Sequence, residues 1–258
     1  MSGEGLPRIL LSPPRWIERQ SLAPATSRSI QTLLALIRAH RTEVGLIVAF
    51  AIGAGLVLTF GLFADEVLEG DVAGFDRAVF SAVRRGGELG TPIGPSWLQG
   101  FSRDVTALGS MGFLGFITAA TIGYLLLIRQ RALALLMAVA VIGGMLVSTL
   151  LKLGFNRPRP DLPHLVEVYT ASFPSGHATL SAITFLTLAA LLARVHDQRR
   201  VQVYFMALAI LLTVAVGVSR VYLGVHYASD VLAGWCVGSA WAILCWASAL
   251  WLERSRGR

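Results

Sequence analysis

Long apolar runs alternate with short polar segments along most of this chain. Five runs contain no charged side chain and are roughly 19 to 24 residues long, enough to cross about 30 Å of hydrocarbon as a helix. These runs cover residues 44–64, 105–128, 132–151, 201–219 and 231–252. A sixth run, 178–193, is shorter and spans if residues 174–177 form an interfacial first turn. The pattern predicts an all-α polytopic membrane protein with six transmembrane helices.

Two further segments place apolar residues at helical spacing. From Val72 to Val83 they recur at intervals of three and four, and Gly86-Gly87 ends the pattern. We expect a short helix here, lying on the membrane surface. Residues 29–40 form either an in-plane amphipathic helix or a frayed leader to the first span. The chain is therefore divided into a basic N-terminal tail, residues 1–41, and a six-span domain, residues 42–258.

Composition agrees with a membrane protein. The 258 residues are 55% hydrophobic and only 14% charged, whereas the charged fraction of an ordinary soluble domain is about a quarter. The formal net charge is +7, and in a soluble protein such a positive charge would suggest a nucleic-acid partner. Here the arginines lie in short loops and tails, where membrane topology explains them better, so no nucleic-acid partner is expected.

The arginines also predict the orientation. Counting loops alternately, one side receives the N-terminal tail with its six arginines and the polar links 129–131, 194–200 and 253–258. The positive-inside rule makes that side cytoplasmic, together with both termini. The other side receives loop 65–104, with seven acidic residues against four arginines. It also receives three unusual polar segments, residues 152–160, 174–177 and 219–230.

The first segment concentrates cationic side chains. Lys152 is the only lysine among the 22 lysines and arginines, and Arg157 and Arg159 follow it, each before a proline that keeps the backbone extended. A guanidinium binds a phosphate bidentately and an ammonium acts as a point charge, so the mixture suits an oxyanion. The alternative is a basic anchor that reaches lipid headgroups at the interface.

The second segment is Pro174-Ser175-Gly176-His177, directly before an apolar run. Ser175 is placed to cap a helix, and Gly176 lets a ligand approach the backbone closely. The amides and the positive dipole end of a helix start form an anion site. A plain helix cap with an interfacial histidine is the alternative.

The third segment runs from Ser219 to Asp230 and contains Arg220, Gly224 and His226. On a helix, His226 and Asp230 would share a face, and the carboxylate would hold one ring nitrogen while the other kept a free lone pair. A nucleophilic or basic histidine needs this pairing. Arg220 reaches His226 only if the chain turns, and Gly224 is the expected break. A purely structural His-Asp pair is the alternative.

A metal ion bound by His177, His226 and Asp230 is a further reading. The cationic side chains expected on the same membrane face would repel such an ion. We therefore expect no metal and no cofactor.

Together the three segments resemble the signature of the type 2 phosphatidic acid phosphatase (PAP2) superfamily, Lys-x6-Arg-Pro, Pro-Ser-Gly-His and Ser-Arg-x5-His-x3-Asp. Residues 152–160, 174–177 and 219–230 match the three parts completely and in order. The resemblance covers about Gly109 to Trp251. Each part alone is weak, but three parts with fixed internal spacings are specific.

The resemblance implies a six-helix membrane phosphatase that works without metal. His226 is expected to attack phosphorus, with Asp230 orienting it. His177 is expected to protonate the leaving oxygen and later to activate water. The groups implied to hold the phosphate are Lys152, Arg159, Ser175, the Gly176 amide and Arg220. Arg157 lies outside the signature, and we expect it to contact the lipid headgroup.

The expected function is hydrolysis of a lipid phosphate at the extracytoplasmic face of a bacterial inner membrane. The substrate would be phosphatidic acid, phosphatidylglycerol phosphate or undecaprenyl diphosphate, and the oligomeric state is left open. One histidine must be neutral while the other is protonated, so a bell-shaped pH dependence is expected. Two alternatives are a phosphotransferase that passes the phosphoryl group to a lipid or sugar, and a lipid transporter or scramblase.

Overall fold

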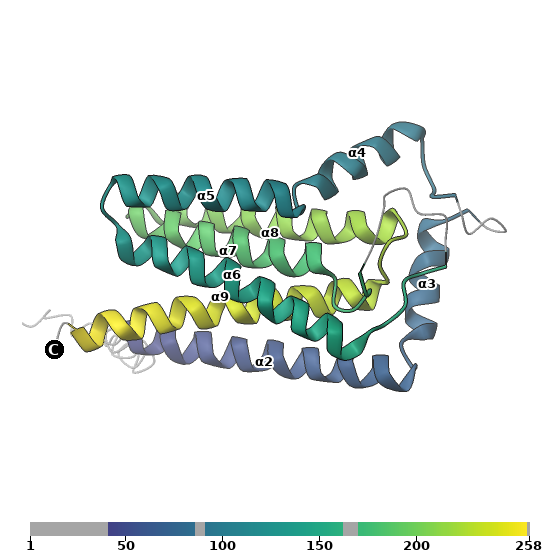
Figure 1. The fold of residues 1–258 in the computed structure, drawn as a ribbon, viewed down its shortest axis with the longest axis horizontal. Helices are drawn as coiled ribbons and strands as arrows, with labels where there is room; N and C mark the ends of the chain where they lie inside the picture. The colour runs from purple at the N-terminus through teal and green to yellow at the C-terminus, as the bar shows by residue number, and fades with distance from the viewer. Residues whose placement is uncertain (1–40, 86–90, 162–169, 257–258) are drawn as a thin grey trace, which may run out of the picture. The chain divides into compact units, whose positions relative to one another are not determined.

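The computed structural model describes residues 41–85, 91–161 and 170–256, and over these residues the chain is helical, with no strands (Figure 1). The helices of the described residues are α2 (Arg41–Glu69), α3 (Ala73–Val83), α4 (Ser96–Ala107), α5 (Met111–Leu127), α6 (Arg131–Phe155), α7 (Gly176–Val195), α8 (Arg199–Tyr222) and α9 (Ala228–Arg256). The predicted all-α membrane fold is confirmed.

The chain divides into two compact units, Met1–Gly45 and Leu46–Arg258. Only residues 41–45 of the first unit are described, as the beginning of α2. The amphipathic helix expected at residues 29–40 lies outside the described residues. Everything below concerns the second unit.

Five of the described helices, α2, α6, α7, α8 and α9, are long and apolar enough to cross a membrane. Helices α4 and α5 pass the same test together, but they meet at an angle of 43°, which makes six spans if the bent pair counts as one. The continuous helix predicted over residues 105–128 is therefore wrong. Gly109 lies at the bend, and Ser110 caps α5 by accepting a hydrogen bond from the amide of Phe113 at 3.2 Å.

Helix α7 is the most enclosed of the spans. Its most apolar window is 61% buried inside the protein, compared with 6% for α2, so α7 is packed by protein while α2 is left largely to lipid. Ile183 on α7 is fully buried with Met137 and Ala140 of α6 and Val216 of α8. This core fixes α7 between its neighbours (Figure 1).

Two glycines bring α9 close to the start of α7. A Cβ atom at Gly234 would lie 2.8 Å from the carbonyl oxygen of Ser175, and one at Gly238 would lie 2.5 Å from that of Thr179. Small residues four apart allow this approach between membrane helices. The second and third turns of α9 therefore lie directly beside the first turn of α7.

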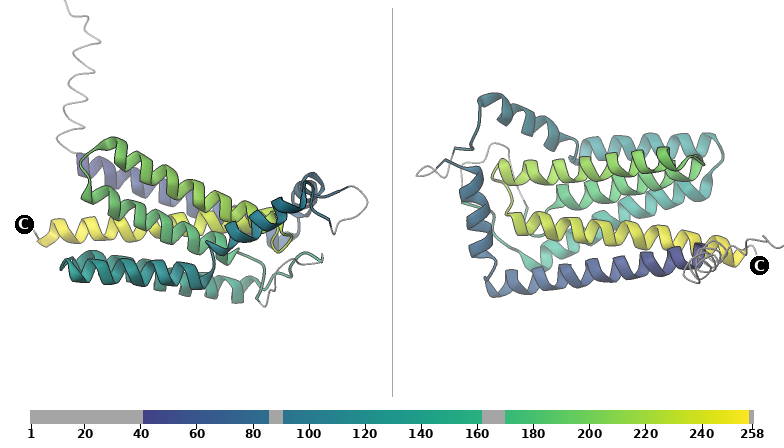
Figure 2. Two further views of the ribbon diagram at one scale, coloured as in Figure 1. Left: turned by 90° about the horizontal axis from the view of Figure 1, so that it is seen from above. Right: turned by 180° about the vertical axis from the view of Figure 1, so that it is seen from behind.

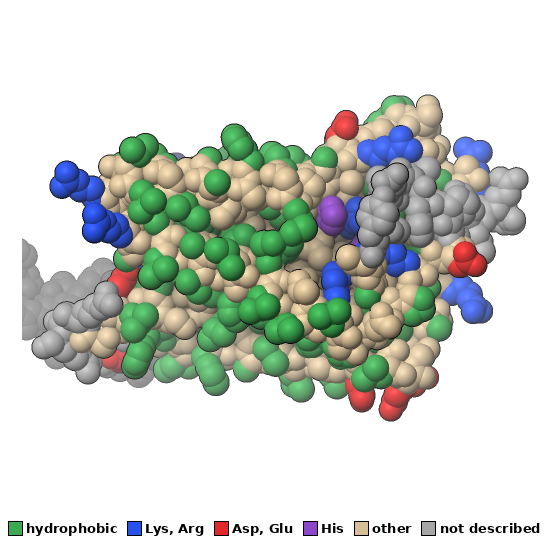
Figure 3. All heavy atoms as spheres, viewed as in Figure 1, with side chains coloured by type: hydrophobic (Ala, Val, Ile, Leu, Met, Phe, Trp, Pro, Cys, Tyr) green, Lys and Arg blue, Asp and Glu red, His purple; other side chains and the backbone are tan. Residues whose placement is uncertain are grey.

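The loop over residues 65–104, which was predicted to be extracytoplasmic and to carry one surface helix, contains α3 and most of α4. Helix α3 has nearly the predicted bounds, ends before Gly86 and crosses the ends of the long helices (Figures 1 and 2). Helix α4 was not predicted separately, because its last residues were assigned to the following span. Hydrophobic side chains cover the middle of the long helices, and charged side chains gather at both ends (Figure 3).

Candidate active site

The three signature segments meet at one end of the helices, around His226. The ring is only 1% exposed, its Nδ1 lies 3.3 Å from Oδ2 of Asp230, and its Nε2 lies 3.1 Å from Nη1 of Arg159. His226 is not on a helix with Asp230, as its spacing suggested. It lies in the connection before α9, and Asp230 lies in the first turn of α9. The expected contact forms despite this difference.

These contacts determine the tautomer of His226. A guanidinium can only donate hydrogen bonds, so Nε2 must accept from Arg159. The proton of the neutral ring is then on Nδ1, where it points to the carboxylate of Asp230. The lone pair of Nε2 faces the cations of the site, which is the form a nucleophilic histidine needs.

Asp230 is fully buried, and hydrogen bonds hold both of its oxygens. Besides the ring of His226, Oδ2 accepts from the amide of Tyr227 at 2.9 Å and from the hydroxyl of Ser172. Oδ1 accepts from Arg157 at 2.6 Å. Ser172 was missed by the sequence reasoning, because it lies outside the signature and no periodic pattern marks it.

The turn predicted at Gly224 is confirmed. Helix α8 ends at Tyr222, and Gly224 has a φ of 76°, a backbone conformation that favours glycine. The amide of Val225 donates to the carbonyl of Arg220 at 3.2 Å and closes the turn. The turn returns the chain so that Arg220 and His226 belong to the same site.

The signature cations are held by neutral groups. Lys152 donates to the carbonyl of Ala171 at 2.6 Å, Arg159 donates to the carbonyls of Thr170 and Val225 at 2.7 Å, and Arg220 donates to the hydroxyl of Thr106 at 3.2 Å. Within the described ranges, none of these three cations forms an ion pair with a carboxylate. Carbonyl and hydroxyl partners carry no net charge, so they do not neutralise these cations. The positive charge remains available to bind an anion.

The start of α7 adds neutral donors to this site. Ser175 occupies the N-cap position, but its side chain does not cap the helix as predicted. Its hydroxyl is buried and has no hydrogen-bond partner among the described residues. A Cβ atom at Gly176 would lie 3.4 Å from Cε of Lys152, so the amides that begin α7 lie beside the lysine. Because the first amides of a helix have no partner within it, they are available to an anion.

His177 completes the group from the first turn of α7. It is partly exposed, and its ring lies close enough to Arg220, Arg159 and Lys152 to interact electrostatically with these three cations. A Cβ atom at Gly109 would lie 3.3 Å from Cδ2 of His177, so the bend between α4 and α5 touches the ring. The unpredicted break in this span therefore borders the site.

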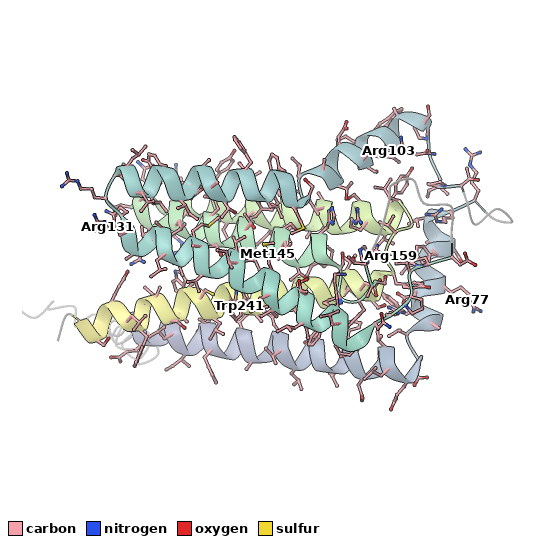
Figure 4. All side chains as sticks on the ribbon, in the orientation of Figure 1. Arg77, Arg103, Arg131, Met145, Arg159 and Trp241 are labelled. Atoms are coloured by element: carbon pink, nitrogen blue, oxygen red, sulfur yellow. The ribbon has the colours of Figure 1, made fainter. Side chains whose placement is uncertain are left out.

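Arg157 differs from the sequence expectation. Its Nη1 donates to Asp230 at 2.6 Å, and its Nη2 donates to Asp76 of α3 at 2.9 Å. Any contact with a lipid headgroup would have to compete with these two ion pairs. Figure 4 shows Arg159 at the same end of the helices as Arg77 of α3, and Arg131 at the opposite end.

Burial dominates the electrostatics of His226. It lowers the pKa of His226 to about 3, although the hydrogen bond to Asp230 raises it in part. Burial also lowers the pKa of Arg159, and Asp230 opposes that effect. Nε2 of His226 is therefore unprotonated at neutral pH. Among the described residues, no three His, Cys, Asp or Glu side chains are grouped so that they could hold a metal ion.

The lowered pKa of His226 predicts a loss of stability in acid. The unfolded histidine titrates near 6.5 and the folded one near 3, so between these values the unfolded state binds the extra proton. Stability should fall as the pH falls from about 6.5 towards 3, by at most about 1.4 kcal/mol per pH unit from this group. The measurement is the apparent Tm in detergent from about pH 6.5 to about pH 4.5. His226→Gln should show a shallower dependence, and identical slopes would contradict the assignment.

Comparison with known proteins agrees with the geometry. The sequence model of the PAP2 superfamily matches residues 133–254. Phosphatidylglycerophosphatase B of Bacillus subtilis (strain 168) is 34% identical over 146 residues, which are 55% of this chain and 70% of that protein. The chain belongs to the PAP2 superfamily.

Two further similarities support the same family. Lipid A 1-phosphatase of Rhizobium etli is 34% identical over 175 residues, 64% of this PAP2 chain and 70% of that protein. The crystal structure of a transmembrane PAP2 type phosphatidylglycerolphosphate phosphatase from Bacillus subtilis aligns with a TM-score of 0.70 and 28% identity. The alignment covers 78% of this chain and 96% of that chain. This PAP2 protein is a multi-pass membrane hydrolase of phosphoric esters, of the lipid phosphate phosphatase type.

Proposed function

We propose that this PAP2 protein removes phosphate from a lipid phosphomonoester or diphosphate through a phosphohistidine on His226. The observation that carries the proposal is the environment of Nε2 of His226. This nitrogen keeps its lone pair, its ring is held by Asp230, and it faces Arg159 near two further cations without carboxylate partners. A nucleophile and an anion site at one place support phosphoryl transfer.

In the first step, the lone pair of Nε2 attacks phosphorus, and the bond between phosphorus and the leaving oxygen breaks. His177 gives its proton to that oxygen, so the lipid leaves as an alcohol or as a lipid monophosphate. Asp230 accepts the hydrogen bond from Nδ1 and stabilises the positive charge that develops on the ring of His226.

In the second step, water attacks the phosphohistidine. His177, now neutral, takes a proton from the water, and the bond between phosphorus and Nε2 breaks. Free phosphate leaves, and both histidines return to their starting protonation states. The phosphate oxygens are held throughout by Lys152, Arg159, Arg220, the hydroxyl of Ser175 and the amide of Gly176.

Phosphatidic acid, phosphatidylglycerol phosphate and undecaprenyl diphosphate are the proposed substrates. Two relatives are named phosphatidylglycerophosphatase B and lipid A 1-phosphatase. These names support a substrate that is a membrane lipid with its phosphate at the headgroup level. The links at the far end of the helices contain Arg129, Arg131, Arg194, Arg199 and Arg200. This charge favours a cytoplasmic position for that end, with both termini there and the site on the extracytoplasmic face of a bacterial inner membrane.

The test is phosphate release by the purified protein in nanodiscs, with each of the three lipids and no added metal. We expect phosphate from at least one lipid, and an equal rate from His196→Ala, which replaces a histidine at the other end of α7. Adding an alcohol acceptor distinguishes the phosphotransferase, which would form a phosphorylated acceptor in place of phosphate. Lipid movement between leaflets without phosphate release would favour the transporter and contradict the proposal.

A further inference from the structure

Arg157 joins two buried carboxylates that lie far apart in the sequence. Nη1 donates to Asp230 at 2.6 Å, Nη2 donates to Asp76 at 2.9 Å, and both carboxylate side chains are at least 98% buried. The guanidinium carbon also lies 4.3 Å from the ring centroid of Tyr227. One cation is thus clamped between α3 and the first turn of α9.

Asp76 is tied to the same turn a second time. Its Oδ1 accepts from the amide of Ser229 at 2.9 Å, and its Oδ2 accepts from the hydroxyl of Ser229 at 2.6 Å. That hydroxyl also accepts from Arg157 at 2.8 Å. Ser229 directly precedes Asp230, so α3 holds the backbone and, through Arg157, the side chain of the residue that orients His226.

The clamp, which is formed by Arg157 and Asp76, supplies the hydrogen bond to one oxygen of Asp230. Oδ2 receives His226, Ser172 and the amide of Tyr227, whereas Arg157 is the partner that the structure shows for Oδ1 among the described residues. A buried carboxylate oxygen without a donor is costly, so loss of Arg157 would favour rotation of Asp230 or its protonation. Rotation would take Oδ2 away from Nδ1 of His226, and protonation would remove the negative charge that stabilises the ring as it becomes positive.

The pKa of Arg157 agrees with a structural role for its two ion pairs. Burial lowers the pKa of Arg157, but the charges and hydrogen bonds of Asp230 and Asp76 outweigh burial and raise it overall. Arg157 therefore remains charged in its partly buried position. Lys152, Arg159 and Arg220 differ, because neutral groups hold them and their charge is left for the phosphate.

We propose that Arg157 and Asp76 are positioning residues for the reaction, which fix Asp230 and, through it, the nucleophilic ring of His226. The inference rests on the proposed function of His226. It gives the surface helix α3 a task in the chemistry, and it assigns Arg157 a role other than contact with the headgroup.

The first test variant is Arg157→Gln. We expect kcat to fall by about 10- to 100-fold, as is usual when the partner that orients a site residue is removed. KM should change by less than about threefold, because the phosphate-binding cations remain. The loss should be similar for phosphatidic acid and phosphatidylglycerol phosphate. A headgroup contact predicts instead a larger KM and a loss that differs between the two lipids, and that result would overturn the proposal.

The second variant is Asp76→Asn, which keeps the side-chain shape and replaces an acceptor for Arg157 with a donor. It keeps the protein testable if Arg157→Gln fails to fold, which thermal unfolding would reveal. We expect kcat to fall by about 3- to 10-fold, with the burst of phosphohistidine formation slowed by the same factor. An unchanged burst rate would overturn the proposal.

Neighbouring exposed residues provide matched controls. Arg77→Gln removes one positive charge and Asp71→Asn removes one negative charge, as the two test variants do, but from exposed residues near the clamp. Figure 4 shows Arg77 pointing away from the helices. Both should keep the wild-type kcat. In a double-mutant cycle, Arg157→Gln and Asp76→Asn together should cost less than the product of the single losses, because both break one clamp. Multiplying losses would contradict the clamp.

The inference and the proposed function fail in different ways. If His226→Ala were active, the proposed function would fail whatever the clamp variants did. If His226→Ala were inactive while both clamp variants kept the wild-type kcat, only the positioning role would be lost.

Discussion

Replacing His226 with alanine is expected to abolish phosphate release, with a loss of about a thousandfold or more. The reason is that no other described nitrogen combines a free lone pair, a carboxylate partner and nearby cations that form no ion pair with a carboxylate. The groups proposed to bind the phosphate, Lys152, Arg159 and Arg220, remain in this variant. A lipid phosphate should therefore still bind with an affinity similar to that of the wild type.

Chemical trapping makes this prediction specific to a phosphohistidine. Wild-type protein incubated with a substrate labelled on phosphorus should carry a label that is lost in acid and kept in base. The label should map to His226 and should be absent from His226→Ala. His196→Ala is the matched control, since it removes a histidine whose Nδ1 lies near the carbonyl of Leu192. Label retained by His226→Ala would mean that another group is the nucleophile.

Replacing His177 with alanine is expected to slow turnover by about 10²- to 10⁴-fold, the usual contribution of a general acid and base. Both proposed steps use this ring, because the leaving oxygen needs a proton and the attacking water must lose one. Binding should change little, since His177 is not among the groups proposed to hold the phosphate oxygens.

The two steps can be separated in His177→Ala by the choice of substrate. With an aryl phosphate, the aryloxide leaves without needing a proton while the phosphoryl group passes to His226, so the first step should proceed and the second should remain slow. The labelled phosphohistidine should then accumulate to a higher level than in the wild type. Full activity in this variant, or a label lower than that of the wild type with the aryl substrate, would contradict the assignment of His177 to hydrolysis.

The sequence predicted most of the membrane architecture. Charge-free runs predict spans well because a backbone in hydrocarbon must satisfy its own hydrogen bonds, which favours helices. The surface helix α3 was also predicted, since Phe80 and its apolar neighbours follow a helical period. The helix predicted over residues 105–128 is broken, because hydropathy does not record the bend at Gly109. A Cβ atom at Gly109 would lie 2.4 Å from a side-chain carbon of Val216 on α8, so that contact is tertiary.

The signature segments likewise predicted which residues meet. Lys152, His177, Arg220 and His226 come from the three signature segments, and the structure brings these segments together at one end of the helices. Their catalytic roles remain proposals until the variants are measured. The bell-shaped pH dependence also remains a prediction, although the lowered pKa of His226 agrees with a neutral nucleophile.

By itself, the sequence determined the class of fold, the family and the cations and histidines of the site, because hydropathy and motif spacing are local properties of the chain. Only the tertiary structure decided what surrounds Asp230. The hydroxyl of Ser172 donates to it from a segment that shares no spacing with it, Asp76 of α3 holds the neighbouring Ser229, and the guanidinium of Arg157 bridges the two buried carboxylates. These contacts depend on the close packing of α3, α7 and α9, and no local pattern encodes them.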